Sequence, residues 1–382
     1  MSVTDVVVIG GGIAGVSTAA LLADAGVSVR LVERAEIAAG ASGRNSGIVQ
    51  HPFDALLADL YRRTLTEYRT LADDDGAGAR EAGFGLADAP AGLLYVGHDP
   101  AAAQAAAAQW SAAWPATFPE VLDGARLTRL EPALAPDLVA CRLDIGYPVA
   151  PAAATVAFAA LARRRGVQVV VGVAAAPVLD GGRVIGVAID GWVEPAGAVV
   201  VAAGPWTPSI IDPGGSWMPI VRSWGVVAAI ELAGAPRHGL EAIDIVIEPE
   251  DDGDPGGDGV DFSLVPAAGS SSLGSTFLPV EPDPKAWIEA LRRNGSRYVP
   301  GVADAPLLGV RSCARPVSRD GRPLIGRAPW ADGLWILAGH GPWGISTGPG
   351  SARLLADAIL ERDVRIPAAF RTDRFGAPPR AG

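Results

Sequence analysis

The chain has 382 residues and a formal net charge of −11, from 42 acidic and 31 basic side chains. This length exceeds one ordinary hydrophobic core, so two domains are expected, and the negative charge argues against nucleic acid or anionic membrane surfaces as partners. The two cysteines exclude a disulfide framework and a cysteine-rich metal site, and we expect no metal. A first core strand close to Met1 and the lack of a long apolar run predict a cytoplasmic protein without signal peptide or membrane span.

The N-terminal segment predicts a dinucleotide-binding βαβ unit. An apolar strand, residues 6–9, leads into Gly10-Gly11-Gly12-Ile13-Ala14-Gly15 and then into a helix rich in alanine and leucine. Gly10 permits a tight turn, Gly12 lets the backbone approach a pyrophosphate, and Gly15 lets the helix pack on the strand. The helix start offers free N–H groups to the phosphates. Glu33 ends a second strand, residues 29–32, where an acidic side chain accepts hydrogen bonds from a ribose.

The first half of the chain continues mainly with helices. Hydrophobic spacing and turn residues predict helices at 55–71, 101–114, 119–130 and 151–165, a strand at 92–96, and a turn at the acidic residues 73–76.

The second half is richer in strands. The pattern predicts strands at 167–171, 174–179, 184–189, 198–201, 226–231, 243–247, 262–266, 271–278 and 334–338, and a final helix at 347–360. The strands from 226 to 278 suggest an antiparallel sheet. The acidic run 251–259 is interpreted as a solvated hairpin tip, because it lacks the spaced bidentate acid of a calcium loop.

A second glycine loop, Gly339-His340-Gly341-Pro342-Trp343-Gly344, also fits the dinucleotide pattern, so a nicotinamide cofactor has to be considered. Its context does not suit one, because the chain ends about twenty residues after the next helix, leaving no room for a second βαβ strand, and bulky Trp343 stands where close backbone approach is wanted. We interpret this loop as aiming another helix N-terminus at the far end of the first cofactor.

These motifs together resemble the D-amino-acid oxidase superfamily of FAD-dependent oxidoreductases, which includes glycine oxidase and monomeric sarcosine oxidase. The matching segments are residues 8–15 with Glu33, 40–47, 200–206, 315–326 and 339–350. The resemblance implies an α/β fold in which a Rossmann-type FAD-binding domain is interleaved with an α+β substrate domain built on an antiparallel sheet. We expect the FAD-binding domain at 1–80, 148–213 and 306–382, and the substrate domain at 81–147 and 214–305.

The resemblance also implies which residues hold FAD. The ADP half would lie on the first glycine loop and Glu33, the pyrophosphate near Ser42 to Arg44, adenine against the backbone of Val173, and the flavin pyrimidine edge at Gly344 to Thr347. N–H groups at that helix start would oppose the negative charge of a reduced flavin. The full set is Gly10, Gly12, Ile13, Ala14, Gly15, Glu33, Arg34, Ser42, Gly43, Arg44, Asn45, Ser46, Gly47, Val173, Ala203, Gly204, Trp206, Gly341, Gly344, Ile345, Ser346 and Thr347.

Arg315 falls where glycine oxidases place an arginine that binds the substrate carboxylate, and a planar guanidinium suits such bidentate binding. The alternatives are an exposed loop arginine or an ion pair with Asp320 or Glu131, and Arg44 and Arg222 are reserve candidates for the carboxylate. His340, Trp343 and His51 complete the candidate catalytic pocket. No base is required if the amine binds neutral, so the histidines are interpreted as pocket walls or loop residues. Further candidates to line the pocket, or to belong to the core, are Tyr147, Trp206 and Trp224.

The reaction implied is hydride transfer from the amine-bearing carbon of a small or N-substituted amino acid to flavin N5, giving an imine that hydrolyses, with O2 reoxidising the flavin to give H2O2. A dehydrogenase that passes electrons to a quinone or a carrier protein, or a non-catalytic flavin-binding subunit, are the alternatives. The lysine that assists oxygen in sarcosine-oxidase relatives is missing, because residues 271–274 occupy that neighbourhood, which keeps the acceptor open.

Cys313 is the one plausible point of covalent flavin attachment. It precedes Asp320 with the spacing found in sarcosine-oxidase relatives. The residues around it, Arg315-Pro316, instead resemble glycine oxidase, so noncovalent FAD is expected.

Overall fold

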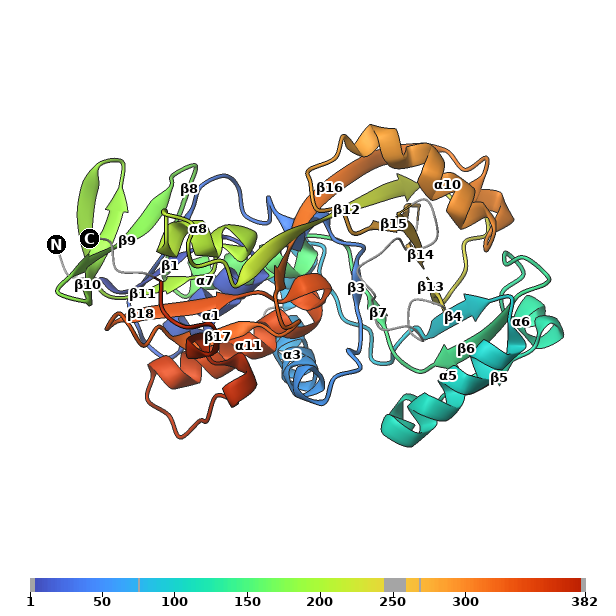
Figure 1. Ribbon diagram of the computed structural model, residues 1–382, viewed down its shortest axis with the longest axis horizontal. Coiled ribbons are helices and arrows are strands. Elements are labelled where there is room, and N and C mark those ends of the chain that lie inside the picture. The colour runs from blue at the N-terminus through green and yellow to red at the C-terminus, as the bar shows by residue number, and fades with distance from the viewer. Residues whose placement is uncertain (1–3, 75, 244–258, 268, 379–382) are drawn as a thin grey trace.

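The computed structural model describes residues 4–74, 76–243, 259–267 and 269–378. Two large sheets form its two halves, and the long strands β12 and β16 run from one half toward the other (Figure 1). Among these residues no helix combines the length and apolar character needed to cross a membrane. The mixed α/β architecture has the expected class: a parallel sheet with dinucleotide-binding topology and a largely antiparallel second sheet.

The first sheet has β1 near its centre, in the strand order β17-β18-β11-β1-β2-β8. β1 pairs in parallel with β2 and β11. Residues 6–9 are buried because both faces of the sheet are covered, which is why this strand is continuously apolar. The bounds are β1 Thr4–Ile9, β2 Val29–Glu33, β8 Gln168–Val171, β11 Trp192–Val201, β17 Leu324–Arg327 and β18 Leu334–Ala338.

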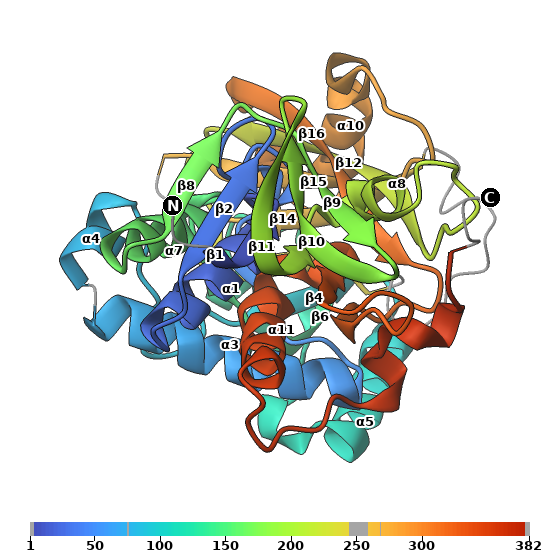
Figure 2. The same ribbon diagram turned by 90° about the vertical axis from the view of Figure 1, so that its left-hand side faces the viewer.

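Helices cover one face of this sheet, and a strand hairpin packs on the other (Figure 2). The helix side buries the apolar residues of α1, α3, α7 and α11 in one cluster, and the opposite cluster contains Val184 and Val187 of the hairpin. The bounds are α1 Ile13–Asp24, α3 Ala55–Asp74, α4 Gly76–Glu81, α7 Ala153–Arg164, α8 Thr207–Ile211, α11 Gly344–Ile359, β9 Ala175–Asp180 and β10 Arg183–Ile189.

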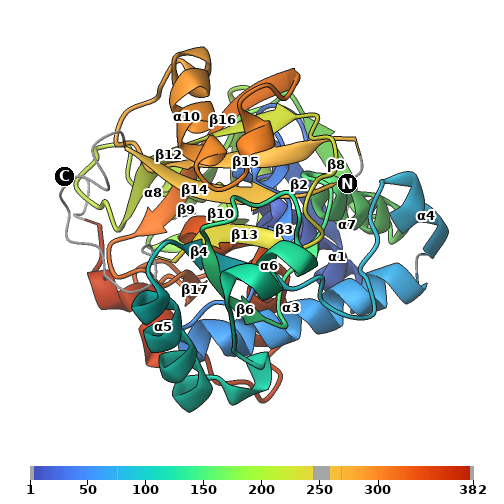
Figure 3. The same cartoon turned by 90° about the vertical axis from the view of Figure 1, so that its right-hand side faces the viewer.

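The second sheet has the strand order β16-β12-β15-β14-β13-β4-β6-β5 and is antiparallel except between β13 and β4 (Figure 3). Helix α10 packs on one face, and α5 covers part of the other at β4 and β6. The bounds are β4 Leu93–Gly97, β5 Glu120–Leu122, β6 Val139–Leu143, β12 Ile220–Ile230, β13 Gly239–Ala242, β14 Val260–Val265, β15 Ser271–Thr276, β16 Leu307–Ser318, α5 Pro100–Ala113, α6 Gly124–Leu130 and α10 Ile288–Ser296.

The register of this sheet gathers polar residues on the face away from α10. Residues opposite each other in neighbouring strands point to the same face. Glu241 lies opposite both Tyr95 and Ser263, Ser263 lies opposite Gly274, and Val227 lies opposite both Gly274 and Arg311. One row thus crosses the sheet from Tyr95 to Arg311, while the alternate residues, such as Leu264 and Leu273, form the apolar core under α10.

Some predicted elements differ from the structure. The helix expected at 119–130 is strand β5 followed by α6, because Asp123 caps a new helix by accepting a hydrogen bond from the Arg126 N–H at 2.8 Å. The helix expected to stop before the acidic turn continues to Asp74. β13 ends at Ala242, before the strand expected at 243–247 would begin. Residues 244–247 of that strand and 251–258 of the acidic run lie outside the described part.

A short two-stranded sheet and the helix before it complete the fold between the two halves. Its strands are β3 Ile48–Val49 and β7 Tyr147–Pro148, and the helix is α2 Ala41–Arg44. Strand β16, which the sequence analysis did not anticipate, pairs along its whole length with β12 in the second sheet. The expected division into domains stays a prediction.

Candidate functional site

The first glycine loop is shaped by contacts that leave no room for side chains. Gly10 has φ +120°, and a Cβ there would lie 2.7 Å from the carbonyl carbon of Ala202. A Cβ at Gly15 would collide with the carbonyl oxygen of Gly10. At Gly12 the nearest atom would instead be the Ser42 hydroxyl, at 3.1 Å. Gly10 and Gly15 are therefore required by the turn itself, whereas Gly12 faces the 41–44 segment.

Glu33 is fixed by hydrogen bonds at the end of β2. Its carboxylate accepts from the Gly11 N–H at 2.6 Å and from the Ala35 N–H at 2.8 Å, one bond on each oxygen. Each oxygen keeps a lone pair, so the group can still accept from a hydroxyl. The backbone N–H of Val173 donates to the Glu33 carbonyl at 3.1 Å, which places the predicted adenine residue beside the predicted ribose residue.

Helix α2 joins the glycine loop through a side-chain hydrogen bond, and the residues after it are tied back to the helix. The Ile13 N–H donates to the Ser42 hydroxyl at 2.9 Å. The Asn45 amide donates to the Ser42 carbonyl at 2.9 Å and accepts from the Gly47 N–H at 2.8 Å. At Gly43 a Cβ would collide with the Ala38 carbonyl, so this loop is also closely packed.

The start of α11 lies against the start of α1. A Cβ at Gly348 would be 3.1 Å from the Ile13 side chain. The Tyr68 hydroxyl donates to the Ile345 carbonyl at 2.7 Å, and the Gln50 N–H donates to the Ser346 hydroxyl at 2.9 Å. The structure therefore brings the start of α11 next to the first glycine loop and the end of β3, although Gln50 and Ser346 are 296 residues apart in the sequence.

The remaining predicted cofactor residues fall into two places. Ala203 and Gly204 follow β11 next to Gly10, and Gly341 begins the turn that leads into α11. The guanidinium of Arg34 stacks on Trp206 at 4.0 Å from the ring centroid. Trp206 is half-buried and lies beside the end of β2. The reserve candidate Arg222 is exposed, and its guanidinium carbon lies 6.0 Å from the centroid of the same ring.

Arg315 lies on the polar face of the second sheet. Its Nη1 donates to the Thr276 carbonyl at 2.7 Å, and its Nη2 donates to the Ser275 hydroxyl at 2.6 Å. The guanidinium also lies over the Phe277 ring, 4.2 Å from the centroid. Burial lowers the pKa of Arg315 from its usual value, although Cys313 and Asp261 act in the opposite direction. A guanidinium in such a place still has donors for a carboxylate.

The alternative ion-pair partners of Arg315 are engaged elsewhere. Asp320 pairs with Arg374 at 2.7 Å, and Glu131 lies 2.5 Å from His238 Nδ1. The ion-pair interpretation of Arg315 is therefore wrong for both acids, and its place on β16 rules out the exposed loop. The reserve candidate Arg44 is exposed and donates to the Ser312 carbonyl at 3.3 Å.

Arg311 is a residue that the sequence analysis missed. Its guanidinium donates to the Arg44 carbonyl at 3.2 Å, the Asn45 carbonyl at 2.8 Å and the Ser272 hydroxyl at 2.8 Å. It therefore ties the predicted pyrophosphate loop to the substrate-side sheet. Its spacing of two from Cys313 and four from Arg315 is the strand signal that could have revealed it, because such residues share one face.

Gln50, Tyr95 and Glu241 form a second cluster that the sequence analysis missed. The Gln50 amide donates to the Tyr95 hydroxyl and to the Glu241 carboxylate, both at 3.1 Å. Burial is the main reason why the pKa of Glu241 rises to about 7. An acid within the apolar pattern of β13 was the available signal, but no strand was expected there.

Both candidate histidines are neutral at physiological pH. Burial lowers the pKa of His340 to about 4, and burial with the nearby charge of Arg62 lowers the pKa of His51 to about 4. His340 Nε2 and His51 Nδ1 are buried and have no hydrogen-bond partner among the described residues. His51 packs among the rings of Phe53, Tyr61 and Trp114, which supports its interpretation as a wall residue.

The candidate aromatic residues divide between core and site. Trp343 packs against the helix-side core and, with His340, belongs to the turn before α11. Tyr147 is buried in β7, whereas Trp224 is half-buried in β12.

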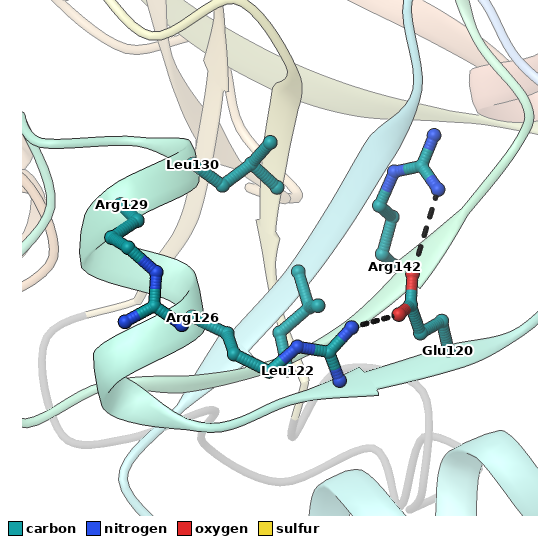
Figure 4. A pocket seen from close by; sticks show the side chains of 6 residues that line it. All are labelled: Glu120, Leu122, Arg126, Arg129, Leu130 and Arg142. Atoms are coloured by element: carbon teal, nitrogen blue, oxygen red, sulfur yellow. Dashed lines mark hydrogen bonds and ion pairs between the residues drawn. The ribbon is translucent and has the colours of Figure 1, made fainter.

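A separate pocket of about 370 Å³ lies at the far edge of the second sheet, lined by Glu120, Leu122, Arg126, Arg129, Leu130 and Arg142 (Figure 4). Glu120 pairs there with both Arg126 and Arg142. β5 and α6 supply most of this pocket, and the strand order places it away from β16 and Arg315. Within the described ranges no group of three or more histidine, cysteine, aspartate or glutamate residues could hold a metal ion.

Comparison with known proteins identifies the family. A family model described as "DAO: FAD dependent oxidoreductase" matches residues 5–358. The chain belongs to this family. It is an FAD-dependent oxidoreductase.

Curated relatives are similar over part of their length. A D-amino acid dehydrogenase of Xylella fastidiosa is 28% identical over 257 residues, 65% of this chain and 56% of the relative. A glycine oxidase of Pseudomonas aeruginosa is 32% identical over 192 residues, 50% of this chain and 49% of the relative. The chain thus spans about half the length of the curated relatives it matches.

Solved structures share the whole fold. Glycine oxidase from Geobacillus kaustophilus aligns with a TM-score of 0.79 at 22% identity and covers 99% of each chain. An iminodiacetate oxidase from a Chelativorans species aligns with a TM-score of 0.78 at 23% identity, covering 97% of this chain and 98% of that one.

FAD is the cofactor that family membership implies, and the two helix starts fit it. The first turns of α1 and α11 carry no acidic residue, and no N-cap side chain bonds to them, so the positive ends of both helices are available to an anion or a polar ring edge. Gly12 adds no side chain between α1 and the 41–44 segment. Glu33 has lone pairs left for a ribose. These residues form a cradle of the kind a dinucleotide needs.

Proposed function

We propose that this protein oxidises a small or N-substituted amino acid at its amine-bearing carbon, and that Arg315 binds the substrate carboxylate. The observation that carries this proposal is the place of Arg315. Its guanidinium is half-buried and oriented by Thr276 and Ser275 on the polar sheet face, and these two bonds use only two of its five N–H donors. A carboxylate is the anion that matches the remaining fork.

Bound FAD would supply the acceptor for the hydride that leaves the substrate carbon. Gly10 to Gly15 and Glu33 would hold its ADP half, and the N–H groups at the start of α11 would face its pyrimidine edge. Arg315 would fix the distance and angle of the reacting carbon through the carboxylate. With a pKa of about 4, His340 and His51 are too weakly basic to remove an ammonium proton efficiently, so the amine would react in its neutral form.

We further propose that O2 reoxidises the enzyme and yields H2O2, and that FAD is held noncovalently. The alternative acceptor is a quinone or carrier protein. The observation that favours this alternative is the absence of a lysine on the described part of the polar face, where β15 presents Ser272 and Gly274, while Lys285 is exposed elsewhere.

The test is anaerobic reduction of the FAD-loaded protein by a panel of amino acids, both enantiomers of each, followed by mixing with oxygenated buffer. Loss of flavin absorbance with at least one amino acid, and H2O2 in proportion to substrate, is the expected result. Reduction without H2O2, with electrons passing to an added quinone, would replace the oxidase by the dehydrogenase. No reduction by any amino acid would leave a flavin-binding protein without amine chemistry.

A further inference from the structure

Glu241 is a carboxylate without a cationic partner on the same sheet face as Arg315. Its hydrogen bond with Gln50 measures 3.1 Å, and the Tyr95 hydroxyl is its other neighbour in the cluster. Both partners are neutral, and no ion pair joins Glu241 to an arginine, lysine or histidine of the described part. Burial penalises the charged form of a carboxylate, and a cation placed beside it would stabilise that form. Glu241 remains partly exposed, so a ligand can supply that cation.

The cluster around Glu241 is held toward the predicted cofactor. Gln50, which bonds Glu241 through its side chain, bonds Ser346 at the start of α11 through its backbone N–H. Tyr95 and Gln50 are almost fully buried, at 1% and 6% exposure, so they fix the carboxylate from behind and leave it facing the sheet surface.

Arg315 and Glu241 are close enough for one ligand to bridge them. The Arg315 guanidinium reaches across β12 to bond Ser275 and Thr276, and therefore lies above the end of β15. Glu241 stands two strands away on β13, about 10 Å across the sheet at the usual strand spacing, and in register with Gly274, two residues before Thr276 on β15. Asp261 on β14 lies between them, and its charge acts on both groups.

We propose that Glu241 determines specificity by binding a distal ammonium group of the substrate. The preferred substrates are then amino acids whose side-chain ammonium nitrogen lies about four to six bonds from the carboxylate carbon, as in ornithine. Arg315 binds the carboxylate at one end, and Glu241, assisted by the charge of Asp261, binds the cation at the other. This inference rests on the proposed function and narrows its substrate class.

The ionisation of Glu241 gives the proposal a pH signature. The groups that face its carboxylate are Tyr95, Gln50 and Asp261. Burial and the Asp261 charge raise its pKa to about 7, against the Gln50 and Tyr95 hydrogen bonds that lower it. The carboxylate is therefore charged mainly above pH 7, where an ammonium ligand gains most, and protonated below it.

The experiment compares ornithine with norvaline, which has the same carbon chain without the distal amine, as reductants of the FAD-loaded protein. It also measures, by calorimetry, the binding of 5-aminopentanoate and pentanoate, which lack the α-amine. At pH 8 we expect the wild type to prefer the cationic member of each pair by at least about 10-fold, a typical effect of one charge-assisted contact. Glu241→Gln, which keeps the size of the side chain, should reduce this preference to about 2-fold or less.

Glu231→Gln, a like substitution at an exposed glutamate, is the matched control and should keep the preference. The wild type should also lose most of its preference between pH 8 and pH 6, which tests Glu241 even if the variant fails to fold. Equal use of ornithine and norvaline would overturn the inference and leave the proposed function intact. If neither ornithine, norvaline nor any other amino acid reduced the flavin, the proposed function itself would be refuted. An unchanged preference in a folded Glu241→Gln protein would also overturn the assignment.

Discussion

The guanidinium of Arg315 fills the space directly above Gly225. A Cβ at position 225 would lie 2.5 Å from both Cζ and Nη1 of Arg315. Cys313 is the residue opposite Gly225, and Arg315 comes two residues later on the same strand face. Glycine at 225 therefore lets the arginine lie flat across β12 and reach Ser275 and Thr276 on β15.

Gly225→Ala should displace the Arg315 guanidinium without unfolding the sheet, because a flexible side-chain end moves more easily than backbone. We expect kcat/KM to fall about 10- to 100-fold, since loss of orientation at the carboxylate misplaces the reacting carbon. Steady-state kinetics with flavin content and Tm measured in parallel provide the check. Gly309→Ala, on the neighbouring strand β16 with nothing within 4 Å of the new Cβ, is the control. An unaltered kcat/KM in Gly225→Ala would show that the pose of Arg315 has no part in substrate binding.

Gly12→Val should abolish retention of FAD. The branched side chain would crowd the Ser42 hydroxyl, which even a Cβ would approach to 3.1 Å, and would fill the cradle that the pyrophosphate needs. Flavin absorbance per protein after gel filtration measures the effect, with Gly85→Ala, an exposed site with open space, as the control. Normal FAD occupancy in Gly12→Val would mean that the phosphates bind elsewhere.

Acid or heat should release FAD from the purified protein into solution. Burial raises the pKa of the Cys313 thiol, although Arg315, Arg311 and Arg44 oppose this shift, so the nucleophilic thiolate is scarce. Separation of the denatured chain from free flavin, followed by absorbance of both fractions, decides the matter. Flavin that stays on the polypeptide would contradict noncovalent binding, and its loss from Cys313→Ser would then identify the attachment point.

Local patterns explain which parts were predictable from the sequence. The strand, glycine loop and helix of residues 4–24 are consecutive, and each glycine has a direct steric reason, so the βαβ unit and Glu33 could be predicted from spacing alone. The family resemblance added Arg315. β16 was missed because arginines and a proline interrupt its apolar alternation. In the structure its pairing with β12, not an apolar pattern, holds this segment as a strand.

The second half of the site depends on contacts between distant segments. Gln50 and Glu241 are 191 residues apart and meet only because β13 lies beside β4 in the sheet. No spacing rule relates Gly225 to Arg315 either, since β12 and β16 are separated by β13, β14 and β15 along the chain. Such residues become visible only when the register of the second sheet is known.

Arg315→Ala tests the carboxylate site itself. The substitution removes side-chain hydrogen bonds to the Thr276 carbonyl and the Ser275 hydroxyl but leaves the pairing of β16 with β12 in place, so fold and flavin content should persist. Amine-dependent flavin reduction should fall about 10²- to 10⁴-fold, taking a charged bidentate contact as worth roughly 3 to 5 kcal/mol when its partner is left unpaired. Arg315→Lys should recover only part of the rate, because lysine keeps the charge and loses the planar fork.

Stopped-flow reduction at subsaturating and saturating substrate separates binding from the chemical step in these variants. Arg365→Ala, at an exposed arginine, should reduce its flavin like the wild type. Wild-type rates in Arg315→Ala at both concentrations would move the carboxylate site to Arg44 or Arg222, or would indicate an amine substrate without a carboxylate. A defect confined to subsaturating substrate would mean that Arg315 contributes to binding alone, because an orienting contact must also lower the rate at saturation.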